Sequence, residues 1–363
     1  MKIAAAVTQA KSAPFELCEL ELGDLRDDEV LVEVAASGIC HTDLICRDQW
    51  YPVPLPAVLG HEGAGIVEAV GRSVTKVSPG ERVGMTFNSC GRCPTCQIGK
   101  PSYCHQFFEC NFASTRPEDE SSVFGDVHAH FFGQSSFATH AVANERNVVK
   151  LSEAIPLEIA APFGCGIQTG AGAVLNSLDA QAGSTLAVFG AGTVGCSAVL
   201  GGVIAGCTTI IAVDVNPARL EVALELGATH AIDAREADPV EQIGAIADGG
   251  ATYSLETTGV PQVLRRCVDC LAPMGVAGVI GAPAFGTEVS FDVNTILTGG
   301  RVVRGIVEGD SVPDVFLPSL VELWRQGRFP VERLMKFYDF DQIETAAHDS
   351  ESGAVIKAVV RMS

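Results

Sequence analysis

Four cysteines follow one another at short intervals in the first half of the chain. Their spacing is Cys90-x-x-Cys93-x-x-Cys96-x7-Cys104. Four thiolates this close can surround one Zn²⁺ ion tetrahedrally, and a closed set of four leaves no position for a substrate, so the pattern predicts a structural zinc site. An iron–sulfur cluster is the main alternative because C-x2-C-x2-C spacings also occur there, but no second cluster motif and no Cys-Pro ending follow.

A second set of metal-binding side chains is scattered over three glycine-rich segments. The segments are Gly38-Ile39-Cys40-His41-Thr42-Asp43, Gly60-His61-Glu62-Gly63-Ala64-Gly65 and Phe163-Gly164-Cys165-Gly166. Each is weak by itself, because a lone cysteine between glycines usually reflects packing. Together Cys40, His61 and Cys165 supply two thiolates and one imidazole with a fourth position open, which is the composition of a catalytic zinc in alcohol oxidation.

A glycine-rich turn in the second half predicts a dinucleotide site. The motif is Gly190-Ala191-Gly192-Thr193-Val194-Gly195. Gly190 permits a tight turn, Gly192 lets a pyrophosphate approach the backbone, and Gly195 lets helix and sheet pack closely. The helix that begins there offers amide donors and a partial positive charge to phosphate.

An acid at the end of the following strand favours NAD over NADP. Asp214 stands where a carboxylate accepts the adenosine ribose hydroxyls, and it repels a 2′-phosphate. A generic turn with a surface aspartate is the alternative, which the strand before and the helix after the motif disfavour. Arg219, one helical turn further on, is either a ribose contact or an exposed helix charge.

The elements around this motif alternate between strand and helix. A strand over 184–190, a helix over 196–205 and a strand over 209–214 form one strand–helix–strand unit. Further apolar segments continue the pattern: a helix over 217–226 and buried strands over 253–256 and 276–281. We therefore expect an α/β fold with a doubly wound parallel sheet in this half of the chain.

The rest of the chain shows shorter β-like runs between Gly and Pro turns. Runs over 30–35 and 65–70 are examples, and a helix over 312–326 leads to a β-like tail over 354–360. Weak periodicity between Phe107 and Phe131 predicts a long loop, in which Glu118-Asp119-Glu120 is an exposed, acid-rich stretch.

Composition excludes several classes of function. With 363 residues, 47% of them hydrophobic, the chain suits two domains, and a net charge of −20 makes nucleic-acid or membrane binding unfavourable. The start, MKIAAAVTQAKSAPFE, turns polar too early for a secretory signal, so we expect a cytoplasmic location. Cysteines outside the clusters are expected to be small buried hydrophobes: Cys18, Cys46, Cys110, Cys196, Cys207, Cys267 and Cys270.

These motifs together resemble the zinc-dependent medium-chain alcohol dehydrogenases over essentially the whole chain. The resemblance rests on GICHTD, GHEGAG, the four-Cys lobe, FGCGIQTG and GAGTVG. It implies a discontinuous, mostly β, GroES-like catalytic domain over 1–166 and 307–363, and an NAD-binding Rossmann domain over 167–306, with the active site in the cleft between them. Within the family, Arg116-Pro117 and the segment 131–139 look most like bacterial aryl-alcohol (benzyl-alcohol) dehydrogenases.

The resemblance also implies residue roles. Cys40, His61 and Cys165 would hold a catalytic zinc, so that each chain binds two zinc ions, one catalytic and one structural. The implied supporting roles are Asp43 orienting His61, Glu62 behind the metal, Thr42 on the substrate hydroxyl, His41 and Lys357 near the cofactor pyrophosphate, and Thr169 and Val194 at the nicotinamide.

One position departs from the pattern of the liver-type members. They complete a proton relay with a histidine where this chain has Ile45. The expected reaction is otherwise unchanged: zinc lowers the pKa of the bound alcohol, hydride passes to NAD, and the proton leaves through Thr42. Either water or another group must accept that proton.

Several alternatives stay open. The substrate could be a geraniol-type allylic alcohol or a glutathione adduct of formaldehyde. The anionic glutathione adduct would need a positively charged pocket, for which Arg116 is a candidate. Polyol enzymes often lack the lobe or change the third ligand, so Cys165 argues against them. A non-catalytic NAD-binding zinc protein would have lost a ligand, and none is lost. The resemblance also implies a homodimer or homotetramer paired near residues 302–307.

Overall fold

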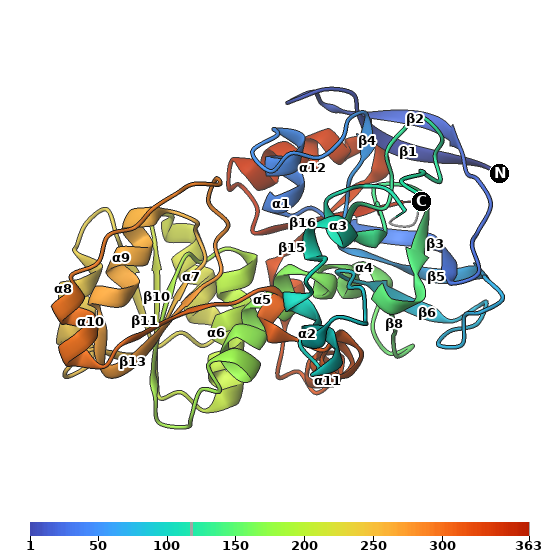
Figure 1. Cartoon of the computed structure of the whole chain (residues 1–363). Helices are drawn as coiled ribbons and strands as arrows, with labels where there is room; N and C mark the ends of the chain where they lie inside the picture. Colours follow the sequence, from blue (N-terminus) through green and yellow to red (C-terminus); the bar gives the residue numbers. More distant parts are fainter. Residues whose placement is uncertain (117–118, 363) are drawn as a thin grey trace. The chain divides into compact units, whose positions relative to one another are not determined.

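The computed structural model describes residues 1–116 and 119–362, and the chain divides into two compact units. The first unit comprises Met1–Cys165 and the residues from Val312 onward, and the second comprises Gly166–Ser311. Figure 1 follows the chain through both. Within the described residues, no helix is long and apolar enough to cross a membrane. Of the predicted acidic stretch, Glu118 lies outside the described residues, as does the neighbouring Pro117.

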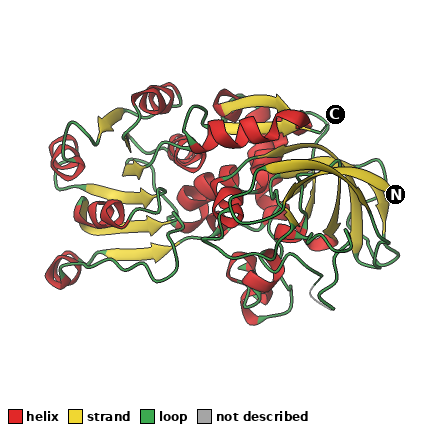
Figure 2. Cartoon of the chain, turned by 90° about the horizontal axis from the view of Figure 1, so that it is seen from above, coloured by secondary structure: helices red, strands yellow, loops and turns green. Residues whose placement is uncertain are grey.

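The first unit is built mainly on antiparallel strands. One sheet has the order β15-β16-β3-β5-β6-β8, with β7 also pairing with β3, and a second has the order β2-β1-β4. Figure 2 shows the long strands of this unit curving around one interior. The strands are β1 (Lys2–Thr8), β2 (Phe15–Glu21), β3 (Glu29–Gly38), β4 (Ala57–Val58), β5 (Gly63–Val70), β6 (Arg82–Met85), β7 (His140–Asn144), β8 (Val148–Lys150), β15 (Met335–Asp339) and β16 (Lys357–Arg361).

Short helices connect these strands and carry several of the predicted site residues. The α-helices are α1 (His41–Arg47), α2 (Pro94–Gln97), α3 (Phe107–Asn111), α4 (Leu157–Ala160), α11 (Pro313–Arg325) and α12 (Ile343–Glu351). The 3₁₀ turns are η1 (Pro101–Tyr103), η2 (Phe131–Gly133), η3 (Glu145–Asn147), η4 (Ala161–Gly164), η7 (Val331–Leu334) and η8 (Phe340–Gln342).

The second unit confirms the predicted doubly wound parallel sheet. Its strand order is β11-β10-β9-β12-β13-β14. The chain adds strands on one side of β9 up to β11 and then on the other side from β12 to β14, as in dinucleotide-binding folds. The strands are β9 (Thr185–Phe189), β10 (Thr209–Asp214), β11 (His230–Asp233), β12 (Ala251–Glu256), β13 (Leu271–Val279) and β14 (Val302–Gly305). The helices are α5 (Gly166–Gly172), continued by η5 (Ala173–Ser177), α6 (Thr193–Ala205), α7 (Pro217–Glu225), α8 (Pro239–Ile246), α9 (Pro261–Asp269), α10 (Val293–Gly299) and the turn η6 (Glu308–Asp310).

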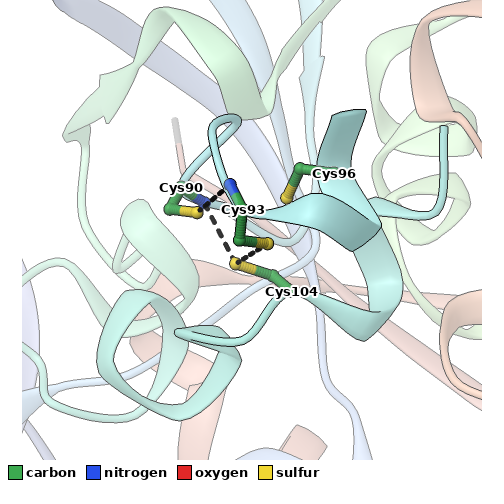
Figure 3. A group of neighbouring side chains, drawn as sticks. All are labelled: Cys90, Cys93, Cys96 and Cys104. Atoms are coloured by element: carbon green, nitrogen blue, oxygen red, sulfur yellow. Dashed lines mark hydrogen bonds between the residues drawn. The ribbon is translucent and has the colours of Figure 1, made fainter. Parts of the chain in front are cut away.

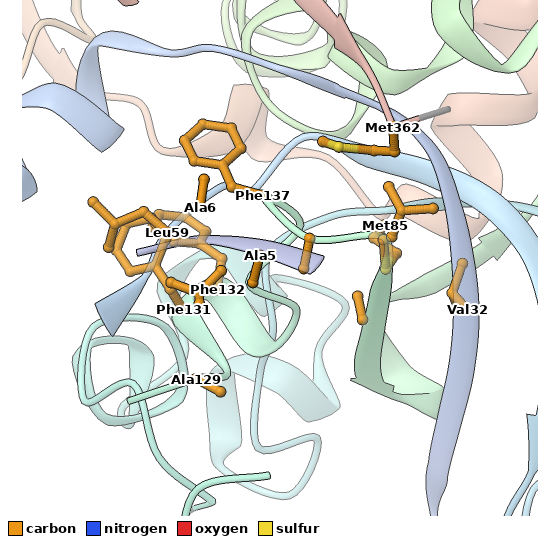
Figure 4. Packing of buried hydrophobic residues seen from close by; sticks show 14 of the residues in the cluster. Ala5, Ala6, Val32, Leu59, Met85, Ala129, Phe131, Phe132, Phe137 and Met362 are labelled. Carbon is orange, nitrogen blue, oxygen red and sulfur yellow. The ribbon is translucent and has the colours of Figure 1, made fainter. Parts of the chain in front are cut away.

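Phenylalanines fill much of the interior of the first unit (Figure 4). The ring of Phe137 packs edge-on against Phe15, with their centroids 5.4 Å apart. It also lies over Gly60, whose φ is +89° and where an added Cβ would come within 2.5 Å of the Phe137 ring. Only glycine accepts both that φ and that contact. The core thereby fixes the turn that presents His61.

The segment between Phe107 and Phe131 is not simply the long loop that its weak periodicity predicts. It begins with the helix α3, in which Cys110 and Asn111 are buried. The Asn111 side chain accepts a hydrogen bond from the Asn88 amide at 2.7 Å and donates one to the Asn88 carbonyl at 3.0 Å. A helix of five residues makes less than two turns, so it has no periodicity to detect.

Candidate metal centres and dinucleotide site

Two clusters of metal-binding side chains lie in the first unit. In each, the candidate ligand atoms lie within 4.8 Å of one another. One cluster is Cys90, Cys93, Cys96 and Cys104, and the other is Cys40, His61, Glu62 and Cys165. The structure thus brings together every residue that the sequence assigned to a metal, and it adds Glu62 to the second cluster.

The four-cysteine cluster has dimensions that suit a tetrahedral ion. Figure 3 shows the four sulfur atoms converging from a loop and from the start of α2. The Sγ atoms of Cys93 and Cys104 are 4.0 Å apart. Zn–S bonds of about 2.3 Å would place two thiolates about 3.8 Å apart. We infer that little movement is needed to accommodate zinc.

Backbone amides of the same lobe point at these sulfur atoms. The amide of Cys90 donates to Cys104 Sγ at 3.2 Å, and the amide of His105 donates to Cys93 Sγ at 3.4 Å. The Thr95 hydroxyl and the His105 amide lower the pKa of Cys93 to about 5, whereas burial and the neighbouring Cys93 raise the pKa of Cys96 to about 12. The lobe thus favours the thiolate of Cys93 and the thiol of Cys96, and a divalent cation bound in place of the thiol protons would balance the charge of four thiolates.

The second cluster takes its members from three separate places in the chain. Cys40 is the N-cap residue of α1, His61 and Glu62 precede β5, and Cys165 follows η4. His61 and Glu62 are completely buried. The backbone at Gly164 lies so close to β6 that an added Cβ would come within 2.1 Å of the Met85 carbonyl oxygen. The glycine before Cys165 is thus required by packing.

Asp43 joins two of these segments. Its Oδ2 accepts a hydrogen bond from the Cys40 amide at 2.9 Å, and its Oδ1 accepts one from the Gly60 amide at 3.1 Å. The same Oδ1 lies 2.8 Å from His61 Nδ1. This contact turns Nε2 of His61 towards the cysteines, where it has no hydrogen-bond partner among the described residues. A buried, unpartnered imidazole nitrogen beside two thiols fits a metal ligand.

The electrostatics of the cluster favour a proton or a cation among these groups. A hydrogen bond from Cys165 lowers the pKa of Cys40 well below that of an ordinary thiol. Burial disfavours the charged form of His61, but Asp43 and Cys40 outweigh it and raise the pKa of His61 well above its usual value. A metal ion must displace the His61 proton in order to bind.

Lys357, predicted to lie near the cofactor pyrophosphate, makes its two described hydrogen bonds within the first unit. It is buried in β16, and its Nζ donates to Glu62 Oε2 at 2.7 Å and to the Ile39 carbonyl at 2.9 Å. Burial disfavours the ammonium, but the Glu62 carboxylate raises the pKa of Lys357. In the structure Lys357 thus holds Glu62, a member of the cluster with Cys40, and its place near the cofactor phosphates stays a prediction.

Gln134 is a supporting residue that the sequence did not single out. Its Oε1 accepts a hydrogen bond from the Gly63 amide at 3.0 Å, and its Nε2 donates to the His61 carbonyl at 2.9 Å. Thr86 donates to the Gly164 carbonyl at 2.7 Å and holds the segment before Cys165 in a similar way. A buried glutamine or threonine between strands carries no sequence signal, because its partners are distant in the chain.

Two aromatic rings pack against His61 of the second cluster. The Phe132 ring stacks on the His61 imidazole with a centroid distance of 4.5 Å and an interplanar angle of 29°. Phe131 meets the same imidazole edge-on at 5.6 Å. The wall beside the histidine is therefore apolar and aromatic.

The remaining predicted residues of this region lie on α1. The Thr42 hydroxyl is 3.7 Å from Cys40 Sγ, whereas His41 is exposed at the first position of the helix. Ile45 is buried and apolar. On α1, Thr42 thus provides a hydroxyl beside Cys40. The apolar side chain of Ile45 cannot exchange a proton.

The glycine-rich turn of the second unit has the geometry that its sequence predicts. Gly190 has a φ of +97°, and a Cβ on Gly195 would come within 1.7 Å of the Gly190 carbonyl oxygen. A Cβ on Gly192, the N-cap of α6, would meet nothing within 4 Å. Open space at a helix N-terminus fits a phosphate group.

The other predicted cofactor residues surround this turn. Asp214 ends β10, and its Oδ2 accepts a hydrogen bond from the Ala191 amide at 2.6 Å. Arg219 is half-buried on α7, and its Nε has no hydrogen-bond partner among the described residues. Thr169 is buried on α5, where its hydroxyl lies 3.3 Å from Glu308 Oε2, and Val194 is half-buried on α6.

Comparison with known proteins gives matches over most of the chain. Residues 26–153 match the family described as alcohol dehydrogenase GroES-like domain, and residues 193–323 match the family described as zinc-binding dehydrogenase. A geraniol dehydrogenase from Castellaniella defragrans is 46% identical over 361 residues, which cover 98% of this chain and 96% of that protein.

Two solved structures are similarly close. The benzyl alcohol dehydrogenase from Acinetobacter calcoaceticus is 48% identical, with a TM-score of 0.98 and complete coverage of both chains. An alcohol dehydrogenase zinc-binding domain protein from Burkholderia ambifaria is 53% identical, with a TM-score of 0.97, and the match covers 100% of this chain and 99% of that one.

Proposed function

Since this chain belongs to the zinc-binding alcohol dehydrogenase family, we propose that it transfers hydride between NAD and a primary alcohol and its aldehyde, with an aryl alcohol such as benzyl alcohol as its substrate. The observation that carries the proposal is the set of half-buried Cys40, buried His61 and half-buried Cys165, whose donor atoms lie close enough to hold one ion. Three protein ligands leave a fourth position for the substrate oxygen.

Two bound groups supply the chemistry itself. Cys40, His61 and Cys165 would hold the zinc, which would act as a Lewis acid and lower the pKa of the alcohol. Gly190, Gly192 and Gly195 form the turn at which we propose that NAD binds, and NAD would supply the hydride acceptor.

The chain's own residues orient the ligands and remove the proton. Asp43 keeps His61 Nε2 directed at the thiols. Thr42, whose hydroxyl lies beside Cys40, is placed to accept the proton of the alcohol. Because Ile45 is apolar, we propose that Thr42 passes the proton to water.

An aromatic substrate fits the surroundings of His61. Phe131 and Phe132 both contact the imidazole, so a ring bound near the metal would meet aromatic faces and edges. The 48% identity with the Acinetobacter benzyl alcohol dehydrogenase supports the same choice.

An allylic alcohol is the second candidate, because the Castellaniella geraniol dehydrogenase is nearly as similar. In both geraniol and benzyl alcohol, the carbon that bears the hydroxyl is bonded to an unsaturated carbon. A comparison of kcat/KM for benzyl alcohol, geraniol and a saturated alcohol of similar size separates a ring requirement from a need for unsaturation.

A glutathione adduct is less well supported. Such a substrate would need a cationic side chain to bind its carboxylates. Arg116, the candidate for this role, is buried. Its Nε and its terminal nitrogen donate to the Glu29 carboxylate at 2.7 Å and 2.6 Å. A guanidinium engaged in this way is not available to an anionic substrate.

We propose NAD rather than NADP because of Asp214, which stands at the end of β10 beside the glycine-rich turn. Its carboxylate would repel a 2′-phosphate. Asp214→Gly is therefore expected to raise kcat/KM with NADP relative to NAD, and an unchanged ratio would contradict the assignment.

We also propose that the chain forms a homodimer or homotetramer through β14. This strand is the last in its sheet, and Val302 and Val303 on it are 44% and 41% exposed. An exposed, apolar sheet edge readily pairs with another copy. Sedimentation analysis of the wild type and of Val303→Lys would test the pairing.

The first experiment measures NAD reduction with benzyl alcohol before and after chelation, with zinc counted per chain. Turnover that prefers NAD and falls on chelation, with two zinc ions per chain, would support the proposal. Two zinc ions without turnover of benzyl alcohol would reject the aryl substrate and leave the reaction class in place. A count of one zinc per chain would reject one of the two metal sites.

A further inference from the structure

A carboxylate is buried in the second unit, just after the last strand of its sheet. Glu308 begins the turn η6, three residues after β14 ends at Gly305, and is 8% exposed. Burying a charged side chain costs free energy unless nearby groups stabilise it. Neither the metal clusters nor the glycine-rich turn includes this carboxylate, so its burial needs another reason.

The turn that carries Glu308 has a left-handed backbone. The φ angle is +50° at Glu308, +64° at Gly309 and +51° at Asp310. A side chain disfavours this region of backbone conformation, so the two residues other than glycine are strained. Such strain persists only where the surrounding structure fixes it, and it is common at sites that bind ligands.

Contacts with α5 fix the turn. A Cβ on Gly309 would come within 2.4 Å of the Gln168 carbonyl oxygen, and a Cβ on Gly172 would come within 2.4 Å of the Gly309 carbonyl oxygen. The Ser311 hydroxyl donates to Gln168 Oε1 at 2.7 Å. Because this bond engages the oxygen of the amide, the amide nitrogen of Gln168 is turned towards Glu308 Oε2, which lies 3.3 Å away. The carboxylate is thus held in one place.

The same carboxylate oxygen meets Thr169. Thr169 Oγ1 lies 3.3 Å from Glu308 Oε2, and an ionised carboxylate can only accept, so the hydroxyl donates. Gln168 and Thr169 are both neutral donors. These bonds therefore orient the carboxylate and leave its negative charge in place.

Thr169 lies close to the helix that begins at the glycine-rich turn. A Cβ on Gly170, the next residue of α5, would come within 2.0 Å of the carbonyl oxygen of Val194, in the first turn of α6. The Ser197 hydroxyl of α6 donates to the Ile167 carbonyl of α5 at 2.6 Å. The helix that carries Thr169 thus packs against the start of the helix that we propose to bind the pyrophosphate.

The order of the strands indicates which half of the cofactor would come near Glu308. A doubly wound sheet is built from two halves, each of which binds one nucleotide at the carboxyl ends of its strands. Asp214, where we propose that the adenosine binds, ends a strand of the half β9-β10-β11. Glu308 follows β14, which belongs to the other half, β12-β13-β14. That half would bind the nicotinamide nucleotide.

We propose that Glu308 makes the cofactor site select NAD over NADH. This inference rests on the proposed function, because it requires the NAD site. The nicotinamide ring of NAD carries a positive charge, which the ring loses when it accepts a hydride. A fixed carboxylate beside Thr169 attracts the charged ring but not the neutral one. Glu308 is therefore a specificity-determining residue that strengthens the binding of NAD and favours the release of NADH after alcohol oxidation.

The dissociation constants of NAD and NADH for the zinc-loaded, full-length protein test the proposal. NADH is titrated by its fluorescence, and NAD is measured by competition with NADH. Glu308→Gln removes the charge and keeps the size of the side chain. It is expected to raise the Kd of NAD at least about fivefold relative to the Kd of NADH, because opposite charges several ångströms apart attract each other inside a protein. Glu308→Asp, which keeps the charge, should retain part of the preference.

Two controls separate the effect of charge from an effect on folding. ADP-ribose, which is the cofactor without its nicotinamide ring, should bind Glu308→Gln as tightly as it binds the wild type. Asp233→Asn removes a carboxylate at the end of β11, the strand at the opposite end of the sheet order. This variant should leave the ratio of the two Kd values unchanged.

An uncharged analogue gives the same comparison without any variant. Benzamide adenine dinucleotide has a planar ring like that of NAD but carries no positive charge on it. The wild type is expected to bind it at least about fivefold more weakly than NAD. Equal affinities would contradict the proposal, even if Glu308→Gln failed to fold.

Three further results would overturn the inference and leave the proposed NAD site in place. The first is an unchanged ratio of Kd values in Glu308→Gln. The second is an equal loss of affinity for NAD, NADH and ADP-ribose, which would show a structural role. The third is the same change of ratio in Asp233→Asn, which would show a general effect of net charge. Absence of NAD binding by the wild type would instead reject the proposed function together with the inference.

Discussion

The four-cysteine lobe takes its ligands from one short segment, Cys90 to Cys104, whereas the buried centre takes Cys40, His61 and Cys165 from three distant segments. The lobe's sulfur atoms receive hydrogen bonds mainly from the lobe's own amides. In the buried centre, the ligand segments are held by residues far away in the chain. We infer that an ion shapes the lobe, while the fold shapes the buried centre before any ion arrives.

Removing one ligand of the buried centre should give the largest effect of all on activity. We expect Cys165→Ser to lower kcat/KM more than about 1,000-fold, because the substrate would lose its Lewis acid. The melting temperature should change little if the fold itself builds this centre. Steady-state kinetics, calorimetry and the zinc count measure the three quantities.

Cys46→Ser provides the matched control. Cys46 is buried on α1, near Cys40 and Asp43, but does not belong to the ligand cluster. This variant should keep both zinc ions and most of its activity. A large fall in the melting temperature of Cys165→Ser but not of Cys46→Ser would contradict the distinction between the lobe and the buried centre. The folding of the buried centre would then also depend on its ion.

Removing one ligand of the lobe should act mainly on stability. We expect Cys104→Ser to lower the melting temperature by at least about 10 °C, because structural zinc contributes directly to the free energy of folding. Cys110→Ser, at a buried cysteine of α3 outside the cluster, is the control. Retained stability together with lost turnover in Cys104→Ser would reverse the two roles.

A change at Asp43, which holds the ligand His61 in place, should have an intermediate effect on activity. Asp43→Asn keeps the shape of the side chain and removes its charge. We expect it to lower metal affinity or activity about 10- to 100-fold, as is usual for residues that orient a ligand histidine. Wild-type activity in this variant would show that Asp43 is dispensable for holding His61.

Proton release on zinc binding should show the smallest difference. Asp43 raises the pKa of His61, so at neutral pH the metal-free centre holds a proton that zinc displaces. The affinity of the buried centre should therefore fall as the pH falls. In Asp43→Asn the pKa of His61 should drop, and zinc titration at about pH 7 should release up to about one proton per chain fewer. Release that is unchanged in the variant would place the proton elsewhere.

The same contrast explains what the sequence could predict. The lobe and the glycine-rich turn lie within single segments, so residue spacing carries their geometry. The parallel sheet was predictable because strands and helices alternate, and β10 covers the predicted range of 209–214. The ligands of the buried centre could be grouped only by residue type and by resemblance to a family.

Contacts between distant segments were not predictable. The position of Lys357 behind Glu62 depends on the pairing of β16 with β3, and no local pattern reports such a register. The contacts of Gln134 could not be predicted for the same reason, because its partners lie on other segments. Arg116 could equally have been exposed from its loop sequence, and only the fold shows it paired with Glu29.

The separation of Glu62 and Lys357 by 295 residues also sets a time scale for biosynthesis. At about 5–20 residues per second, a ribosome needs about 15–60 s to reach the lysine after it has passed the glutamate. The 14 residues that follow Cys90, up to and including Cys104, are translated in about 1–3 s. We expect the lobe to capture its zinc while the chain is still being made, and the buried centre to acquire its own ion only after β16 has been synthesised.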